Sequence, residues 1–331
     1  MLKTCFAAFF TQALVLTLAP QPVMAQAGSG TPMRTPDGQP DVSGIFTFRT
    51  LTPLERPSQF EGRDSLSAEE AAAFEVSERT RQNRDLFDPV TGAPNAGYQP
   101  RAEGGVLSYN EFWYERGIEL TSDKRTSLII DPPNGRRPPR TEAAQVAARE
   151  RRAHTEIHRY DSYENRTMTD RCLGTSVAGP PLRAGAYNNN MMIFQTADHV
   201  VIQNEMASQA RVIPLADTAK PSFAQLKGVS RGHWEGETLV IETTNFRSDS
   251  ALTGPNMHLI ERLTRLDQDT VAYEYTVTDP TVYTAPYTAM IPLRRTDGPI
   301  FEYACHEGNI GLYGILAGAR ELERQGRELR R

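Results

Sequence analysis

The chain has 331 residues and a formal net charge of −5 at pH 7. It has no long run of lysine or arginine, and this charge pattern argues against a nucleic-acid-binding protein. Hydrophobic residues make up only 39% of the chain, whereas glycine occurs 24 times and proline 23 times. This composition indicates many turns and ordered loops, not a helical bundle.

The first 25 residues have the pattern of a secretory signal peptide. Lys3 supplies the positive start, residues 6–18 form an apolar run, and a small-x-small cleavage pattern ends at Ala25. The apolar run is too short to cross a bilayer, and an uncleaved anchor is the alternative. We therefore expect a periplasmic or secreted protein that has no membrane attachment after cleavage.

The next segment, residues 26–66, is poor in periodicity and is predicted to be an extended arm or linker with one short strand over 42–48. Ser67 and Glu70 form a capping box, which predicts a helix that begins at Ser67. Two further helices are predicted over residues 141–153 and 315–331. Short alternating runs predict strands over 111–120, 126–130, 191–195, 199–206, 210–215, 238–244, 258–266, 270–278 and 287–294.

The strand predicted over 270–278 shows the alternation most clearly. Val271, Tyr273, Tyr275 and Val277 form an apolar face, and the intervening residues form a polar one. Such a strand belongs to an antiparallel sheet with one dry side. Its polar side is expected to face water or to line a cavity.

These elements predict a mainly β fold in which an antiparallel sheet closes into a lipocalin-like barrel or half-barrel, with a few helices outside. A β-sandwich is the alternative. A parallel α/β sheet is not expected, because the strands do not alternate with helices. We assign residues 1–25 to the signal peptide, 26–66 to the arm or linker, and 67–331 to a single β-rich domain with peripheral helices.

Two cysteines, Cys172 and Cys305, remain once the signal peptide is removed. In an exported protein such a pair most simply forms one disulfide, and two buried free thiols are the alternative. The bond would close a loop of roughly 130 residues, worth about 5 kcal/mol in the chain-entropy model. It would also bring the polar segment 161–173 beside residues 305–309.

Histidines paired with glutamates are the main chemical signal in the sequence. Three of the six histidines lie in or just after residues 231–280, each with a glutamate close by in the chain: His233 with Glu235, His258 with Glu261, and His306 with Glu307. A histidine oriented by a carboxylate is the usual general base, and an arginine can hold an anionic intermediate. The predicted catalytic residues are His233, His306, Glu235, Glu307, Arg231 and Arg171. The predicted substrate-binding residues are Tyr187, Asn188, Asn190, Glu205, His258, Arg262 and Asn309.

No cofactor is predicted. A divalent metal held by His233, Glu235, His258 and His306 is an alternative, although the sequence contains neither HExxH nor a CxxC pair. A serine nucleophile is not expected: GVSRG at residues 228–232 matches GxSxG, but no predicted strand–turn–helix surrounds it. Purely structural roles, in turns and hydrogen bonds at strand ends, are an equal alternative for each of these residues.

Four motifs carry a family resemblance: DSYENR, YNNN, GVSRGHWEGETLVIETTNF and YACHEGN. With them the chain resembles, over residues 40–320, a widespread group of exported bacterial proteins of uncharacterised function. The resemblance implies export and brings no activity, cofactor, fold or catalytic residue with it.

Two classes of function are compatible with the sequence. The first is an exported enzyme, a lyase, isomerase or hydrolase, that acts on a small organic substrate through His/Glu/Arg acid–base chemistry. The second is a non-catalytic periplasmic binding protein for an apolar or aromatic small molecule. An enzyme requires these ionisable groups to converge in one pocket, whereas a binding protein requires a cavity with apolar walls. The expected partner is a small molecule, and the oligomeric state is left open.

Overall fold

The structure is a computed structural model, which describes residues 33–83, 111–174, 177–216, 221, 223–247 and 254–327. The predicted signal peptide lies outside the described residues. The arm, strands, helices and site residues predicted after the signal peptide fall wholly or largely within the described residues.

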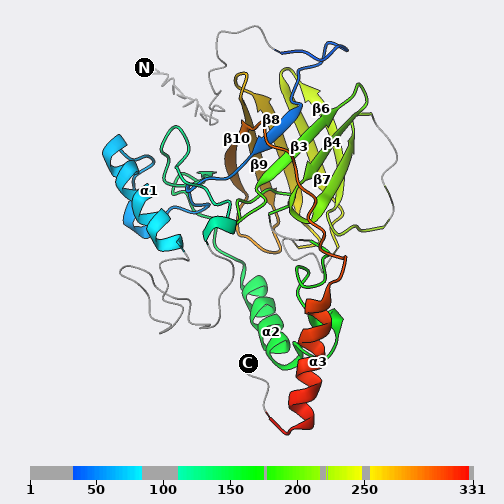
Figure 1. The fold of residues 1–331 in the computed structure, drawn as a ribbon. Coiled ribbons are helices and arrows are strands. Elements are labelled where there is room, and N and C mark those ends of the chain that lie inside the picture. The colour runs from blue at the N-terminus through cyan, green and yellow to red at the C-terminus, as the bar shows by residue number, and fades with distance from the viewer. Residues whose placement is uncertain are drawn as a thin grey trace, which may run out of the picture.

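One antiparallel sheet forms the body of the protein, and its strands are β1 (Gly44–Thr47), β2 (Ile129–Asp131), β3 (Asn190–Gln195), β4 (His199–Asn204), β5 (Gln209–Pro214), β6 (Val229–Glu235), β7 (Thr238–Thr244), β8 (His258–Arg265), β9 (Thr270–Thr278) and β10 (Tyr287–Arg295). The strand order is β5-β4-β3-β1-β10-β9-β8-β7-β6, and β2 pairs with β10 off this path. The sheet curls into a nearly closed barrel, as Figure 1 shows. The predicted mainly β barrel or half-barrel is therefore confirmed.

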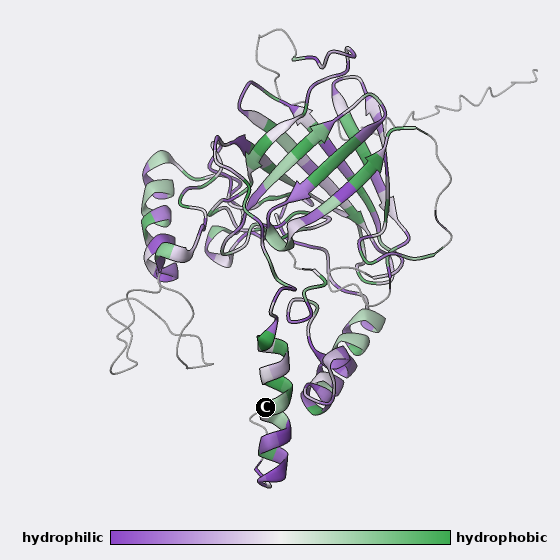
Figure 2. Ribbon diagram, turned by 45° about the vertical axis from the view of Figure 1, so that its right-hand side comes forward, coloured by the Kyte–Doolittle hydropathy of each residue, from purple (hydrophilic) through white to green (hydrophobic). Residues whose placement is uncertain are grey.

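Alternation along the strands sorts the side chains into an inner and an outer set, visible as alternating colours in Figure 2. On β9, Tyr273 and Tyr275 point inward and are 0% and 1% exposed. Full burial of a large apolar side chain is worth about 1.5–3 kcal/mol, so the inner stripe predicted for residues 270–278 holds the core together. The polar face of β9 forms the outer surface of the barrel.

A strand from the predicted arm lies in the middle of the sheet. β1 pairs with β3 on one side and with β10 on the other, and Phe46 lies opposite Met191 and Arg295. The Phe46 side chain is 0% exposed. Residues 44–47 therefore belong to the barrel wall and supply the hydrogen bonds that join its two halves.

The strand predicted over 111–120 is wrong. This segment begins with a 3-10 turn at Glu111–Trp113 and continues without regular structure. Its expected partner, 126–130, uses its backbone elsewhere: the N–H of Leu128 donates to the carbonyl of Pro53 at 2.8 Å, and β2 pairs with β10. Both edges of residues 128–131 are therefore occupied, by residues 53–54 and by β10.

Three helices lie outside the barrel, as predicted: α1 (Ala68–Gln82), α2 (Glu142–His158) and α3 (Ile310–Arg324). The capping box of Ser67 and Glu70 is present at the start of α1. In Figure 1, α1 lies beside the barrel, and α2 and α3 project from one end of it. None of the helices in the described ranges is long and apolar enough to cross a membrane.

Cys172 and Cys305 form the predicted disulfide. The bond joins the segment before α3 to the polar segment 161–173. The Asn309 side chain donates to the Asp170 carbonyl at 3.0 Å, which is a second link between the same two segments. The predicted juxtaposition of these segments is therefore present.

The barrel has a seam where β5 and β6, the two ends of the strand path, lie next to each other. Among the described strands no hydrogen-bonded ladder joins this pair. Gly232 of β6 leaves room for the facing side chains, since a Cβ there would lie 2.8 Å from Leu215 Cδ2 and 3.1 Å from Ile213 Cγ2. Side chains, not backbone pairing, therefore close the barrel.

Candidate functional site

The predicted catalytic pair His233 and Glu235 lies on the outer face of β6. The His233 ring nitrogen Nε2 is 3.1 Å from Glu235 Oε1, and Arg262 of β8 donates to Glu235 Oε2 at 2.8 Å. The three side chains are 57%, 49% and 40% exposed. Arg262 first, and His233 second, hold the pKa of the Glu235 carboxyl below its usual range. These residues contact one another, but on an open convex wall.

His258 also points outward. Its Nε2 atom is 2.7 Å from Oε1 of Glu242 on β7, and both side chains are about two-fifths exposed. Its neighbour in sequence, Glu261, has the opposite parity on β8 and is buried inside the barrel. The sequence pairing of His258 with Glu261 is therefore not present in space.

The predicted binding residues Asn188 and Asn190 of the YNNN motif lie in or beside a hydrogen-bonded cluster of polar side chains at the start of β3. Asn190 donates to the buried Glu205 carboxylate at 2.7 Å, and the same carboxylate accepts from the N–H of Phe301. Asn188 adopts a positive φ of 53°, which asparagine tolerates. The fully buried member is Asn189, which the prediction omitted and which donates to the Glu115 carbonyl at 2.8 Å.

The remaining predicted site residues of this group lie in, or contact, the two segments that the disulfide joins. Tyr187 stacks with Tyr303, with ring centroids 6.5 Å apart. Asn309 caps α3, and its side-chain oxygen accepts from the Leu312 N–H. Arg171 lies over the ring of Tyr163. His306 and Glu307 are exposed between β10 and α3.

The structure therefore brings the predicted residues together in small groups and not in one pocket. Throughout the described ranges, no cluster of three His, Cys, Asp or Glu side chains is close enough to hold a metal ion. The histidines proposed as metal ligands are divided between the outer wall and the segment after β10.

A buried ion pair bridges the seam inside the barrel. Arg211 of β5 is 11% exposed and reaches Glu261 of β8, which is 0% exposed, with Nη2 and Oε1 2.8 Å apart. Tyr273 donates to the same carboxylate at 2.7 Å. Burial lowers the pKa of Arg211, but the Glu261 carboxylate raises it more, so the guanidinium stays charged. Burial, then Glu261, raises the pKa of Tyr273 and keeps it a neutral donor.

A pocket of about 580 Å³ opens at the end of the barrel beside α2, a size typical of small-molecule sites. We call it the mouth pocket. Tyr275, Tyr283 and Tyr287 line it, and their rings meet edge to face, with centroids 6.4 Å apart for Tyr275 and Tyr287 and 5.5 Å for Tyr283 and Tyr287. Hydrophobic side chains such as Met257 complete the apolar wall.

Arginines surround this aromatic floor. Among the described residues lining the pocket, four are arginines and only one, Asp279, is a carboxylate; the arginines are Arg137, Arg140, Arg151 and Arg183. Arg137 donates to the Glu55 carboxylate at 2.6 Å, which raises the pKa of Arg137. The side chains of the other three make no hydrogen bond or ion pair with any described residue. The pocket is therefore positive within a protein of net charge −5.

The tyrosine hydroxyls in this pocket are available as donors. Burial, followed by the nearby Tyr283, raises the pKa of Tyr287 to about 12, and burial also raises the pKa of Tyr275. The charges of Arg137 and Arg183 act against both increases in pKa. Neither hydroxyl has a hydrogen-bond partner within the described part of the chain, so both can donate to a bound oxygen.

The chain has no match among protein-family models, curated proteins or solved structures. The mouth pocket was not anticipated from the sequence, because its residues come from segments more than a hundred positions apart. The sequence signal that points to it is modest: Tyr275, Tyr283 and Tyr287 lie within 13 residues of one another, on both sides of the connection between β9 and β10.

Proposed function

We propose that this protein binds a small organic anion, a carboxylate with an aromatic or apolar body, in the mouth pocket. The observation that carries the proposal is the arrangement of four arginines around a floor of three tyrosines. An apolar body would pack against the tyrosine rings, and the carboxylate would accept hydrogen bonds from guanidinium and phenol groups. The lack of carboxylate partners for Arg140, Arg151 and Arg183 in the described residues supports an anionic partner.

The binding takes place in the periplasm or outside the cell. The signal-peptide pattern and the disulfide support this location, since disulfides persist in oxidising compartments. The acid–base enzyme predicted from the His/Glu pairs stays a prediction. Its histidines lie on open surfaces, where water would compete for a substrate, so the geometry favours the binding function.

The test is a calorimetric titration with matched pairs of ligands, such as phenylacetate and phenylacetamide, extended over a panel of aryl and alkyl carboxylates and their amides. The carboxylates are expected to bind more tightly than their amides. Arg183→Gln should weaken carboxylate binding about 10- to 100-fold, because a hydrogen bond to a charged group is worth about 1.5–3 kcal/mol. Amide binding should change little.

Arg152→Gln is the matched control, because Arg152 is an exposed arginine that does not line the pocket. It should leave every affinity unchanged. The proposal is wrong if no carboxylate in the panel binds more tightly than its amide, or if Arg152→Gln weakens binding as much as Arg183→Gln.

A further inference from the structure

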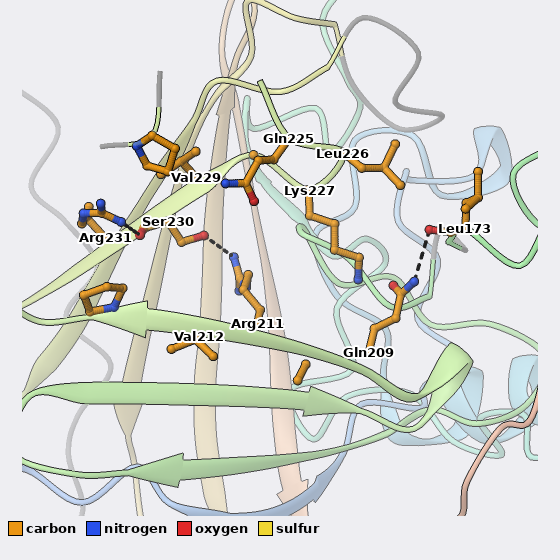
Figure 3. A pocket seen from close by; sticks show the side chains of 14 residues that line it. Leu173, Gln209, Arg211, Val212, Gln225, Leu226, Lys227, Val229, Ser230 and Arg231 are labelled. Atoms are coloured by element: carbon orange, nitrogen blue, oxygen red, sulfur yellow. Dashed lines mark hydrogen bonds between the residues drawn. The ribbon is translucent and has the colours of Figure 1, made fainter. Parts of the chain in front are cut away.

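The seam between β5 and β6 opens outward into a second pocket, of about 680 Å³, which we call the seam pocket (Figure 3). β5 forms one wall, and residues 225–231, which lead into β6, form the other. Hydrophobic side chains such as Val212 and Leu226 supply part of the lining. The pocket is large enough for a small organic molecule.

Lys227 lines this pocket, and in Figure 3 its side chain extends toward Gln209. No hydrogen bond or ion pair joins the Lys227 amine to any described residue. The charged groups that share the lining are Arg211 and Arg231, and no carboxylate lies among the described lining residues. The amine therefore faces the pocket in surroundings that disfavour its charged form.

A second unused polar group lies in the same pocket. The Gln209 amide nitrogen donates to the Leu173 carbonyl at 3.2 Å, but its oxygen Oε1 is buried without a hydrogen-bond partner in the described part of the chain. Buried hydrogen-bond acceptors normally have a donor. An acceptor without one, in the same pocket as an unpaired amine, therefore indicates a place where a ligand can bind.

We propose that Lys227 is a nucleophilic amine that forms an imine with a small aldehyde or ketone bound in the seam pocket. The nitrogen lone pair forms a C–N bond to the carbonyl carbon, and the carbonyl oxygen takes the first proton that the nitrogen releases, which gives a carbinolamine. Its hydroxyl then leaves as water together with the second nitrogen proton, which gives the imine. Gln209 Oε1 is placed to accept a hydrogen bond from the carbinolamine hydroxyl, and no oxidant or reductant is needed.

The protonation of Lys227 agrees with this role. Burial, and then the charge of Arg211, lowers the pKa of Lys227 from 10.5 to about 7. About half of the amine is then neutral at pH 7, compared with roughly one in 3,000 for a lysine of ordinary pKa. Desolvation beside another cation is a known means of activating a lysine nucleophile.

The experiment exploits the scarcity of lysine in this chain, which has only Lys3, Lys124, Lys220 and Lys227. The full-length exported protein is treated at pH 7 with benzaldehyde and sodium cyanoborohydride, whose hydride traps the imine, and labelling is followed at each lysine by peptide mass mapping. Lys227 should be labelled at least tenfold faster than Lys124, at a rate that saturates with benzaldehyde. Lys227→Arg should abolish the fast labelling.

The same reaction in guanidinium chloride is the control, since unfolding removes the pocket and should equalise the two lysines. Equal rates at Lys124 and Lys227 in the folded protein would overturn the proposal. So would a rate at Lys227 that rises linearly with benzaldehyde, or a preference for Lys227 that survives unfolding.

Discussion

Glu261→Leu should lower the free energy of unfolding by about 3–5 kcal/mol, because it leaves the Arg211 guanidinium buried without its carboxylate. Tyr273 loses its acceptor in the same change. Equilibrium denaturation in guanidinium chloride measures the loss. The effect should be large because this ion pair is buried and links β5 to β8 across the seam, where backbone pairing is lacking between β5 and β6.

The double variant Arg211→Met/Glu261→Leu should recover most of that stability, because a buried ion pair can be replaced by apolar side chains at little net cost. Glu242→Leu is the matched control. Glu242 lies on the outer face of the adjacent strand, where both it and its partner His258 are partly exposed, so its loss should cost less than about 1 kcal/mol. A loss at Glu261 no larger than that at Glu242 would show that the ion pair does not close the barrel.

Removing the disulfide by Cys172→Ser/Cys305→Ser should cost about 2–5 kcal/mol, since the bond closes a loop with a sequence separation of 133 residues. The first part of the molecule to loosen should be α3, which buries only Ala319 among its residues. Limited trypsin digestion should therefore cleave within residues 310–324 at least tenfold faster than in the wild-type protein.

Wild-type protein treated with a reductant should behave like the double variant, and the double variant itself should not respond to the reductant. Faster cleavage in the barrel strands, with α3 unchanged, would contradict this assignment of the disulfide to the anchoring of α3.

Periodicity in the sequence was enough to predict most of the barrel. The alternating residues of β9 and the capping box of α1 each depend only on residues that are close together in the chain, so both can be recognised from the sequence. The strand predicted over 111–120 failed because strand formation also needs a free partner. The chain that was to pair with it bonds to Pro53 and β10 instead.

The site was much less predictable. Alternation would place His233 and Glu235 on one face of an extended segment, but the strand β6 itself was not predicted. Its inward-facing residues Ser230 and Gly232 give no hydrophobic signal, and Trp234 alone on that face packs against the core. Lys227 gains its character from burial and from Arg211, and Arg183 from the tyrosines that line the mouth pocket with it. These neighbours are distant in sequence, and their positions depend on the register of the whole barrel.

Hydrogen exchange with and without a saturating aryl carboxylate is the most direct test of the mouth pocket as the ligand site. We predict slower exchange in residues 142–151 of α2 and in residues 279–287, which line the pocket, and no change in β6. Protection in β6 and β8 around His233 and Arg262, without any at the mouth, would contradict the assignment. That result would indicate that the ligand binds on the outer wall of the barrel.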